Sequence, residues 1–239
     1  MGQVPIKKYG IIGDGRVANH LKRYFTYLSI PYIQWSRKNQ TSDELLKLVF
    51  EVDVTLLLIK DDALESFIEA HPELHKKQLL HFSGSKVIKN CYGVHPLMTF
   101  GTDLYPLEVY KKIPFVIDED APDFEVLFPE LQNNFYRISK ENKVFYHALC
   151  VMAGNFSTIL WQKLFQEFEN KLSLPREVAF PYLEILAKNL MKNAEMSLTG
   201  PLIRNDQKVL QSHLDVLKND RFKIIYEAFM QAYQMEEKS

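Results

Sequence analysis

The sequence predicts an α/β fold in which a doubly wound, mostly parallel β-sheet is followed by an all-α domain. Two observations carry this prediction. In the first part of the chain, short apolar segments alternate with segments of helical periodicity, which is typical of parallel strands joined by helices. From Ser139 onward the strand-like segments stop, and only helical patterns follow. We therefore expect two domains, residues 1–139 and residues 140–239.

The first domain is expected to contain short strands separated by helices. The strands are predicted at 8–12, 31–35, 53–59, 78–84, 91–96, 114–118 and 135–138. The helices are predicted at 16–28, 42–50, 61–70 and 124–132. The run from Asp53 to Ile59 is predominantly apolar, as expected for a strand that is buried on both faces of a parallel sheet.

The second domain is expected to consist of helices alone, at 140–170, 176–198, 206–218 and 220–235. The second of these is strongly periodic, with leucines at steps of three and four residues. The Thr199-Gly200-Pro201 segment is a stop signal for that helix, and Asp206 can cap the next one.

Charge and cysteine content limit the classes of partner and the compartment. The formal net charge is −1 and no long run of Lys or Arg is present, so we expect no nucleic-acid partner. Cys91 and Cys150 lie far apart among apolar neighbours and form neither a disulfide framework nor a zinc-binding pattern. We therefore expect reduced thiols in a cytoplasmic protein.

One segment, from Val144 to Trp161, lacks charged residues and has the length of a possible membrane span. It carries His147, Gly154 and Asn155, and such polar groups are costly in lipid unless they find partners. No second candidate span is present in the sequence. We therefore expect a buried helix of a soluble protein, with no membrane partner.

A glycine-rich loop follows the first predicted strand and precedes the first predicted helix. The segment Gly13-Asp14-Gly15-Arg16-Val17-Ala18 matches the dinucleotide-binding pattern Gly-x-Gly-x-x-Gly/Ala in that structural context. Gly13 would make the tight turn, Gly15 would let the backbone approach a pyrophosphate, and Ala18 would keep the helix against the strand. The helix N-terminus would add free N–H groups. The sequence thus predicts a Rossmann-like nucleotide site, with a turn that binds no ligand as the alternative.

The end of the second predicted strand favours NADP over NAD as the cofactor. NAD-binding folds place an Asp or Glu there to hold the ribose hydroxyls. This chain instead has Ser36, Arg37 and Lys38. A hydroxyl and two cations suit a 2′-phosphate, which Arg37 can bind bidentately. An ordinary basic surface loop is the alternative.

The glycine loop and the strand end that follows it resemble those of an uncharacterised family. Three later segments carry the same resemblance, HFSGS at 81–85, GVHPLMTFG at 93–101 and LTGPLIRND at 198–206. The family joins a Rossmann-like N-terminal half to a helical C-terminal half that is similar to that of 6-phosphogluconate dehydrogenase. Its wider relatives include pyrroline-5-carboxylate reductase, prephenate dehydrogenase and ketopantoate reductase. The resemblance implies an NADP-linked oxidoreductase that forms a homodimer through the helical half, and it names no substrate.

Two positions depart from these relatives. The 3-hydroxyacid dehydrogenase branch has a catalytic lysine four residues before an asparagine, whereas this chain has Val151 four residues before Asn155. Many relatives have a proline after the third strand, whereas this chain has Lys60, which could alter the nicotinamide side of the pocket. Because of these departures, a dinucleotide-binding protein without catalytic turnover remains an alternative hypothesis.

Three polar residues are candidates for catalysis. Asn155 and His147 lie eight residues apart, roughly on one face of the most apolar helix, where each could face a cleft between the domains. Asn155 could bind substrate or be a satisfied buried amide, and His147 could donate a proton. His95 lies at the end of a predicted strand, before a proline, where open α/β sheets bind ligands, and could act as a general acid or bond to a nearby carbonyl.

Further polar residues are candidates for binding. Ser83 and Gly84 follow another strand end and, with Lys60, are expected to line the cofactor site. Arg204, preceded by Thr199, could hold a substrate carboxylate bidentately. A helix stop followed by a turn is the structural alternative for these last two residues.

The leading hypothesis is an NADP-dependent oxidoreductase that transfers a hydride to or from a small, anionic metabolite in a cleft between the domains. A dinucleotide-binding sensor or interaction protein without turnover is the alternative, and a function carried by the helical half alone is a third. We expect no metal site, because Pro72 interrupts the pair His71 and His75 and no third ligand is indicated.

Overall fold

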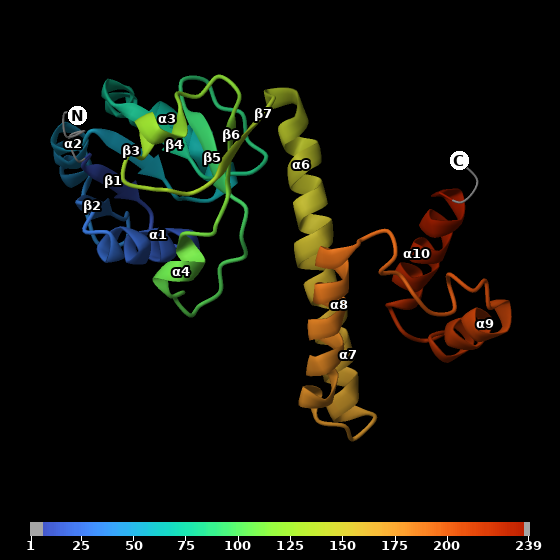
Figure 1. Cartoon of the computed structure of the whole chain (residues 1–239). Helices are drawn as coiled ribbons and strands as arrows, with labels where there is room; N and C mark the ends of the chain where they lie inside the picture. Colours follow the sequence, from blue (N-terminus) through green and yellow to red (C-terminus); the bar gives the residue numbers. More distant parts are fainter. Residues whose placement is uncertain (1–6, 237–239) are drawn as a thin grey trace. The chain divides into compact units, whose positions relative to one another are not determined.

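The computed structural model describes residues 7–236 and divides the chain into two compact units, Met1–Ile159 and Leu160–Ser239 (Figure 1). The helix that begins at Lys143 lies in the first unit up to Ile159. The division of the chain into domains at residues 139 and 140 stays a prediction.

The first unit is built on a seven-stranded sheet, and the expected α/β fold class is confirmed. The strand order is β2-β1-β3-β4-β5-β6-β7. The strands are β1 Tyr9–Ile12, β2 Tyr32–Trp35, β3 Val54–Leu57, β4 Gln78–His81, β5 Tyr92–Pro96, β6 Phe115–Asp118 and β7 Phe135–Ile138. The strands from β2 to β5 pair in parallel, β6 is antiparallel to β5, and β7 is parallel to β6. The sheet is therefore mostly parallel, as the sequence predicts.

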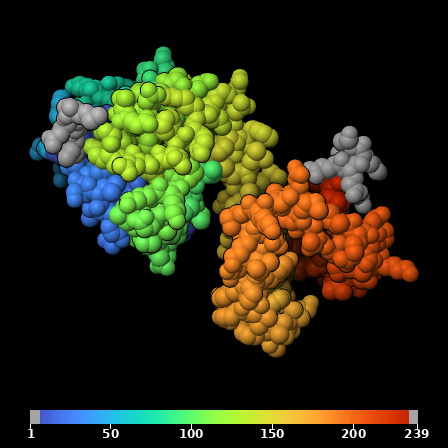
Figure 2. Space-filling model, viewed as in Figure 1, coloured from blue at the N-terminus to red at the C-terminus, as the bar shows by residue number. Residues whose placement is uncertain are grey.

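Helices cover both faces of this sheet, because the strands are apolar on both sides. In β1, Ile11 packs in a cluster with side chains of α1, α4 and α5, whereas Ile12 packs with side chains of α2 and α3. The helices are α1 Arg16–Tyr27, α2 Ser42–Glu51, α3 Leu64–Ala70, α4 Leu107–Tyr110 and α5 Phe124–Leu127. Helix α1 contacts α4, and the space-filling view shows blue N-terminal segments lying against green segments of the same unit (Figure 2).

After β7, the secondary structure of the described residues is helical. They are α6 Lys143–Cys150, α7 Ser157–Asn170, α8 Phe180–Lys192, α9 Gln207–Val216 and α10 Lys223–Glu236. Between α6 and α7 the chain continues as a π-helical segment, Val151–Phe156. The expected helix at 140–170 is therefore continuous but not α-helical throughout.

Two expected helices end well before the residue that the sequence predicts. The helix expected at 124–132 ends at Leu127, because Phe128 precedes Pro129 and the residue before a proline is disfavoured in the α-helical conformation. The helix expected at 176–198 ends at Lys192. There Asn193 is extended and its side-chain oxygen accepts the N–H of Met196, which competes with helix continuation.

The long apolar helix is exposed on this chain. Among the described residues, the helix at 140–170 is the one that is long and apolar enough to cross a membrane by length and composition. None of its most apolar stretch is buried within the chain, so the expectation of a buried helix is wrong for the isolated chain. The exposed large apolar side chains along this helix are Val144, Phe145, Leu149, Met152, Phe156, Ile159 and Leu160.

Candidate functional site

The glycine loop connects β1 to α1 and has the geometry that a close ligand approach requires. Gly13 has φ +128°, a backbone conformation that residues with a side chain rarely adopt. A Cβ at this position would also collide with the carbonyl oxygen of Leu58, so both the backbone and the available space require glycine. Its N–H donates to the carbonyl of Trp35 at 2.9 Å. Gly15 precedes the first residue of α1, and a Cβ there would meet nothing within 4 Å. The backbone at Gly15 therefore faces open space at the N-terminus of a helix.

The loop after β2 folds back onto this glycine loop. The Lys38 ammonium pairs with the Asp14 carboxylate at 2.9 Å. That hydrogen bond lowers the pKa of Asp14, and hydrogen bonding from Ser36 acts in the same direction. Ser36 is buried, whereas the side chains of Arg37 and Lys38 are exposed. The structure thus brings the predicted cofactor residues Asp14, Ser36 and Lys38 together beside Gly15.

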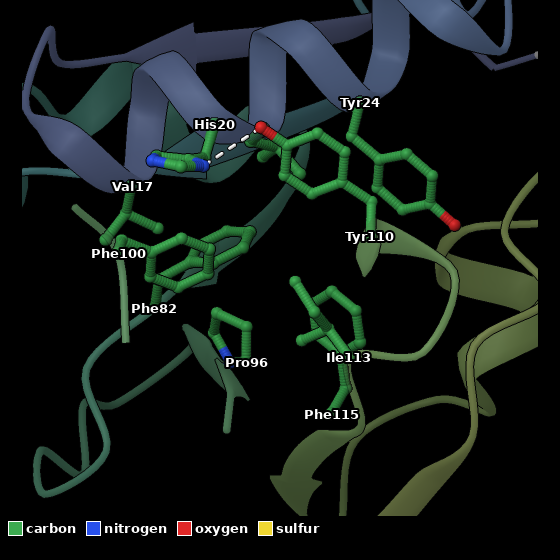
Figure 3. Close-up of a pocket in the computed structure, with 10 residues that line it drawn as sticks. Val17, His20, Tyr24, Phe82, Pro96, Phe100, Tyr110, Ile113 and Phe115 are labelled. Carbon is green, nitrogen blue, oxygen red and sulfur yellow. Dashed lines mark hydrogen bonds between the residues drawn. The ribbon is translucent and has the colours of Figure 1, made fainter. Parts of the chain in front are cut away.

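Arg16, Val17 and Ala18 form the first turn of α1. Arg16 is exposed and Ala18 is fully buried against the sheet, as its predicted packing role requires. Val17 lines a small apolar cavity between α1 and the segment that follows β5 (Figure 3). The cavity has about 20 Å³ of room, enough for about one water molecule, so it cannot hold a metabolite.

His20 ties α1 to the loop between β5 and α4. Its Nδ1 lies 2.9 Å from the Tyr110 hydroxyl, the bond drawn in Figure 3, and its Nε2 lies 3.1 Å from the Gly101 carbonyl. A carbonyl only accepts, so Nε2 carries the proton and Nδ1 accepts from Tyr110. The same hydroxyl accepts the N–H of Tyr105 at 3.1 Å. Hydrogen bonds through His20 and Tyr110 therefore connect the helix of the glycine loop to the loop after β5.

The end of β5 and helix α6 bring two predicted histidines together. The rings of His95 and His147 lie edge to face, with their centres 5.8 Å apart. His95 Nδ1 lies 2.8 Å from the Tyr146 hydroxyl. A Cβ at Gly84 would lie 2.6 Å from the His147 ring and 3.2 Å from the His95 ring, so glycine leaves room for both. Gly84, His95 and His147 form one cluster with Tyr146.

Burial sets the protonation states in this histidine cluster. Loss of solvation is the main reason that the pKa of His95 falls to about 4, and positive charge at His147 and Lys143 lowers it further. Burial, followed by interaction with the Cys150 thiol, raises the pKa of Tyr146 well above its ordinary value. At neutral pH, His95 is therefore a neutral imidazole and Tyr146 keeps its proton.

The ends of β3 and β4 are tied together beside this cluster. The Ser83 hydroxyl donates to the Asp61 carboxylate at 2.6 Å and accepts the backbone N–H of Lys86 at 3.1 Å. Lys60 is exposed three residues after the end of β3 and directly before a short 3₁₀ helix, Asp61–Ala63. Ser83 is therefore held by hydrogen bonds, and its place in cofactor binding stays a prediction.

Asn155 is not part of this cluster, and Thr199 and Arg204 belong to the second unit. Asn155 is exposed on the π-helical segment, so the α-helical spacing that predicts a shared face with His147 does not apply between them. Thr199 and Arg204 are exposed in the second unit, on either side of Gly200, which has φ +96°. Their roles in substrate binding stay predictions.

Sequence reasoning missed four members of the region around His95. Tyr146 and Asp61 hydrogen-bond to predicted residues, and Lys143 and Asp118 form a buried ion pair nearby. Asp118 ends an otherwise apolar strand, and Lys143 begins an apolar helix. A charged residue in an otherwise apolar strand or helix indicates a buried partner, and this signal could have identified Asp118 and Lys143 from the sequence.

Comparison with known proteins places the second half of the chain in a described family. Residues 113–233 match the model of a family described as a domain of unknown function, DUF2520. Among curated proteins, the search finds no match.

Solved structures show the same fold over nearly the whole chain. A Bacteroides fragilis protein, provisionally described as an NADP oxidoreductase, has a TM-score of 0.75 at 21% identity, covering 95% of this chain and 97% of that one. A Thermotoga maritima protein has a TM-score of 0.67 at 20% identity, with 95% and 97% covered. Pyrroline carboxylate reductase of Plasmodium falciparum, with NADP bound, has a TM-score of 0.57 at 14% identity, with 96% and 97% covered. These likenesses concern the fold, and the expected likeness of the helical half to 6-phosphogluconate dehydrogenase stays a prediction.

Proposed function

The chain belongs to the DUF2520 family, and we propose that it is an NADP-dependent oxidoreductase acting on a small, anionic metabolite. One observation carries the proposal. The carboxyl ends of parallel strands in one sheet present an open glycine loop after β1, and a histidine cluster formed by Gly84 after β4, His95 near the end of β5 and His147. Ligands of open α/β sheets bind at this edge. The B. fragilis and P. falciparum proteins, which share the fold, support the choice of NADP.

The residues of the first unit fit a phosphorylated dinucleotide. Gly15 offers open space at a helix N-terminus, where backbone N–H groups can receive a pyrophosphate. Lys38 neutralises Asp14, which would otherwise repel that anion. Ser36 and the exposed Arg37 would hold the 2′-phosphate, together with Lys38. The bound coenzyme would supply the hydride, and the protein has to position it and to manage one proton.

We propose that His147 is the proton donor and that His95 orients it. The low pKa of His95 keeps it neutral at pH 7, so it does not act as a charged acid. His147 lies against the His95 ring and is only partly buried, so it keeps access to solvent protons. The sequence supplies two further proposals. Arg204 and Thr199 would bind the substrate anion, and Asn155 would hydrogen-bond to the substrate.

The test follows NADPH absorbance with panels of imines, keto acids and cyclic enoates. We expect turnover in the wild type and a loss of about 100-fold or more in His147→Ala, because a positioned proton donor contributes that much. His75→Ala, at an exposed histidine, is the matched control and keeps wild-type turnover. Melting curves with and without NADPH verify that both variants still bind the coenzyme.

Two outcomes would redirect the proposal. Full activity in His147→Ala would remove that residue from the mechanism. A clear NADPH-induced rise in melting temperature without oxidation by any panel member would favour the alternative, a dinucleotide-binding sensor or interaction protein.

We also propose that the chain is a soluble, cytoplasmic homodimer. The exposed apolar side chains along 140–170 support this, because soluble monomers rarely expose large contiguous apolar patches. A second copy of the same chain would cover them.

A further inference from the structure

Helix α6 is attached to the sheet by a buried charge. Lys143 is the first residue of α6 and the one residue of that helix that is buried, although most of its neighbours along the helix are apolar. Its ammonium lies 2.5 Å from the Asp118 carboxylate, and the two side chains are 3% and 2% exposed. The same carboxylate accepts the N–H of Gly93 at 2.6 Å. One ion pair thus joins α6 to the ends of β5 and β6.

Gly93 in β5 leaves the space that the Lys143 ammonium occupies beside the sheet. Gly93 pairs laterally with His81 of β4, and Asp118 closes the row on the β6 side. A Cβ at Gly93 would collide with the Lys143 ammonium and lie 2.8 Å from the Asp118 carboxylate. Any residue other than glycine at position 93 would displace the ion pair.

The ion pair lies one helical turn from the histidine cluster. Tyr146 and His147 follow Lys143 by three and four residues, so they project from the same side of α6. His95 follows Gly93 by two residues and shares its face of β5. The two attachments, Lys143 to Asp118 and Tyr146 to His95, therefore share one helix and one strand.

We propose that Lys143 is a positioning residue whose ion pair with Asp118 fixes the start of α6 so that Tyr146 and His147 are held at His95. The expected effect of the ion pair on turnover rests on the proposed function. Its expected effect on the position of Tyr146 and His147 does not. A buried ion pair contributes little net stability compared with apolar residues of similar volume, whereas its geometry is specific. The positive charge also acts on the cluster, because it is among the causes that lower the pKa of His95 and of His81.

The test compares single and double variants of the pair. Lys143→Met and Asp118→Asn each leave one buried charge without its partner, and we expect both to lower the melting temperature strongly. The double variant Lys143→Met with Asp118→Asn removes both charges and keeps an acceptor for the Gly93 N–H. We expect its melting temperature to return close to the wild-type value.

The double variant separates positioning from stability. We expect its kcat to stay at least tenfold below wild type, with the KM for NADPH unchanged. Nitrogen NMR of the histidine side chains, with the His95 signal assigned by its loss in His95→Gln, gives a second readout that needs no substrate. We expect the Nδ1 signal of His95 to move to the position of an imidazole without the Tyr146 hydrogen bond. Gly93→Ala, which pushes on Lys143, should move this signal in the same direction.

Wild-type turnover and an unmoved His95 signal in the stable double variant would overturn the proposal. If the double variant does not fold, an unmoved signal in Gly93→Ala would overturn it instead. A moved signal in a protein that turns over no substrate would uphold the positioning role and contradict only the proposed reaction.

Discussion

His81 shows how one residue can carry a pH dependence of the whole fold. It is fully buried in β4, and neither ring nitrogen hydrogen-bonds to any residue that the structure describes. Burial, with smaller contributions from Lys143 and His95, lowers its pKa to about 3. Folding therefore keeps this imidazole neutral at pH values where the unfolded chain would bind a proton. The folded state loses stability as the pH falls from about 6.5 towards 3, because the unfolded state then binds more protons.

Replacing His81 by leucine should remove that pH dependence. We expect His81→Leu to raise the free energy of unfolding by about 1–3 kcal/mol at pH 7, because an unpaired buried polar group is replaced by an apolar one of similar size. Below pH 6.5 the gain should grow by up to about 1.4 kcal/mol per pH unit. Urea unfolding at several pH values measures it, with His75→Leu at an exposed position as the control. An unchanged or lower stability at pH 5 would contradict the account.

At the scale of elements, the loop between β2 and α2 is built to present its cations. Thr41 caps α2 in a reciprocal pair with Glu44, and its carbonyl accepts the indole N–H of Trp35 at 2.9 Å. The side-chain oxygen of Gln40 accepts the N–H of Ser36 at 2.8 Å. The loop is thus fixed at both ends, and Arg37 is exposed on it.

Removing the Arg37 side chain tests the cofactor preference directly. We expect Arg37→Ala to weaken NADPH binding by about 10-fold to 100-fold, because a charge-assisted contact to the 2′-phosphate contributes about 1.5–3 kcal/mol. NADH binding should be unchanged, which makes NADH the internal control. Equal weakening of both coenzymes, measured by fluorescence titration, would place Arg37 outside the 2′-phosphate site.

The elements also show which parts of the structure could be read from the sequence. The strands lie within the segments that the apolar runs predict. A strand that is buried on both faces of a sheet needs apolar side chains on both sides, so it is visible in the sequence as a continuous apolar run. Helix α4, Leu107–Tyr110, was missed because four residues are too few to show a periodicity. The π-helical segment was missed because it changes the backbone register without any marker residue.

The candidate site was only partly predictable for a related reason. Strand ends identified His95 and Gly84, and the unusual polarity of an apolar helix identified His147. The hydrogen bond between His95 and Tyr146 joins residues 51 positions apart, so no local pattern announces it. The Lys143 and Asp118 pair likewise depends on how α6 packs on the sheet.

At the scale of the whole molecule, the exposed apolar helix is the feature that the isolated chain leaves unexplained. Phe145 is 66% exposed on α6 and Met152 is 58% exposed on the π-helical segment. Such side chains are enriched where subunits meet. The proposed homodimer would bury them without requiring any change in the fold.

A single charge on this surface should break the dimer. We expect Phe145→Asp to convert a dimer into a monomer in size-exclusion chromatography with light scattering, because a buried unpaired carboxylate opposes association. Val126→Asp, at a 57% exposed residue of α5, is the matched control and should stay dimeric. A wild-type chain that is monomeric and binds lipid vesicles would contradict the homodimer and favour a membrane partner.

The central claim is that a phosphorylated dinucleotide lies on the open backbone at Gly15. Isothermal titration of NADPH into the wild type and into Gly15→Val tests it most directly. Gly15 is the N-cap of α1, with φ −71° and ψ −177°, a conformation that valine also adopts. Valine should therefore lower the melting temperature only modestly, as a weaker N-cap, while filling the space needed by the pyrophosphate. The account predicts heat of binding with NADPH for the wild type and none for the variant. No heat from the wild type with either NADPH or NADH, or equal heat from both proteins, would contradict it.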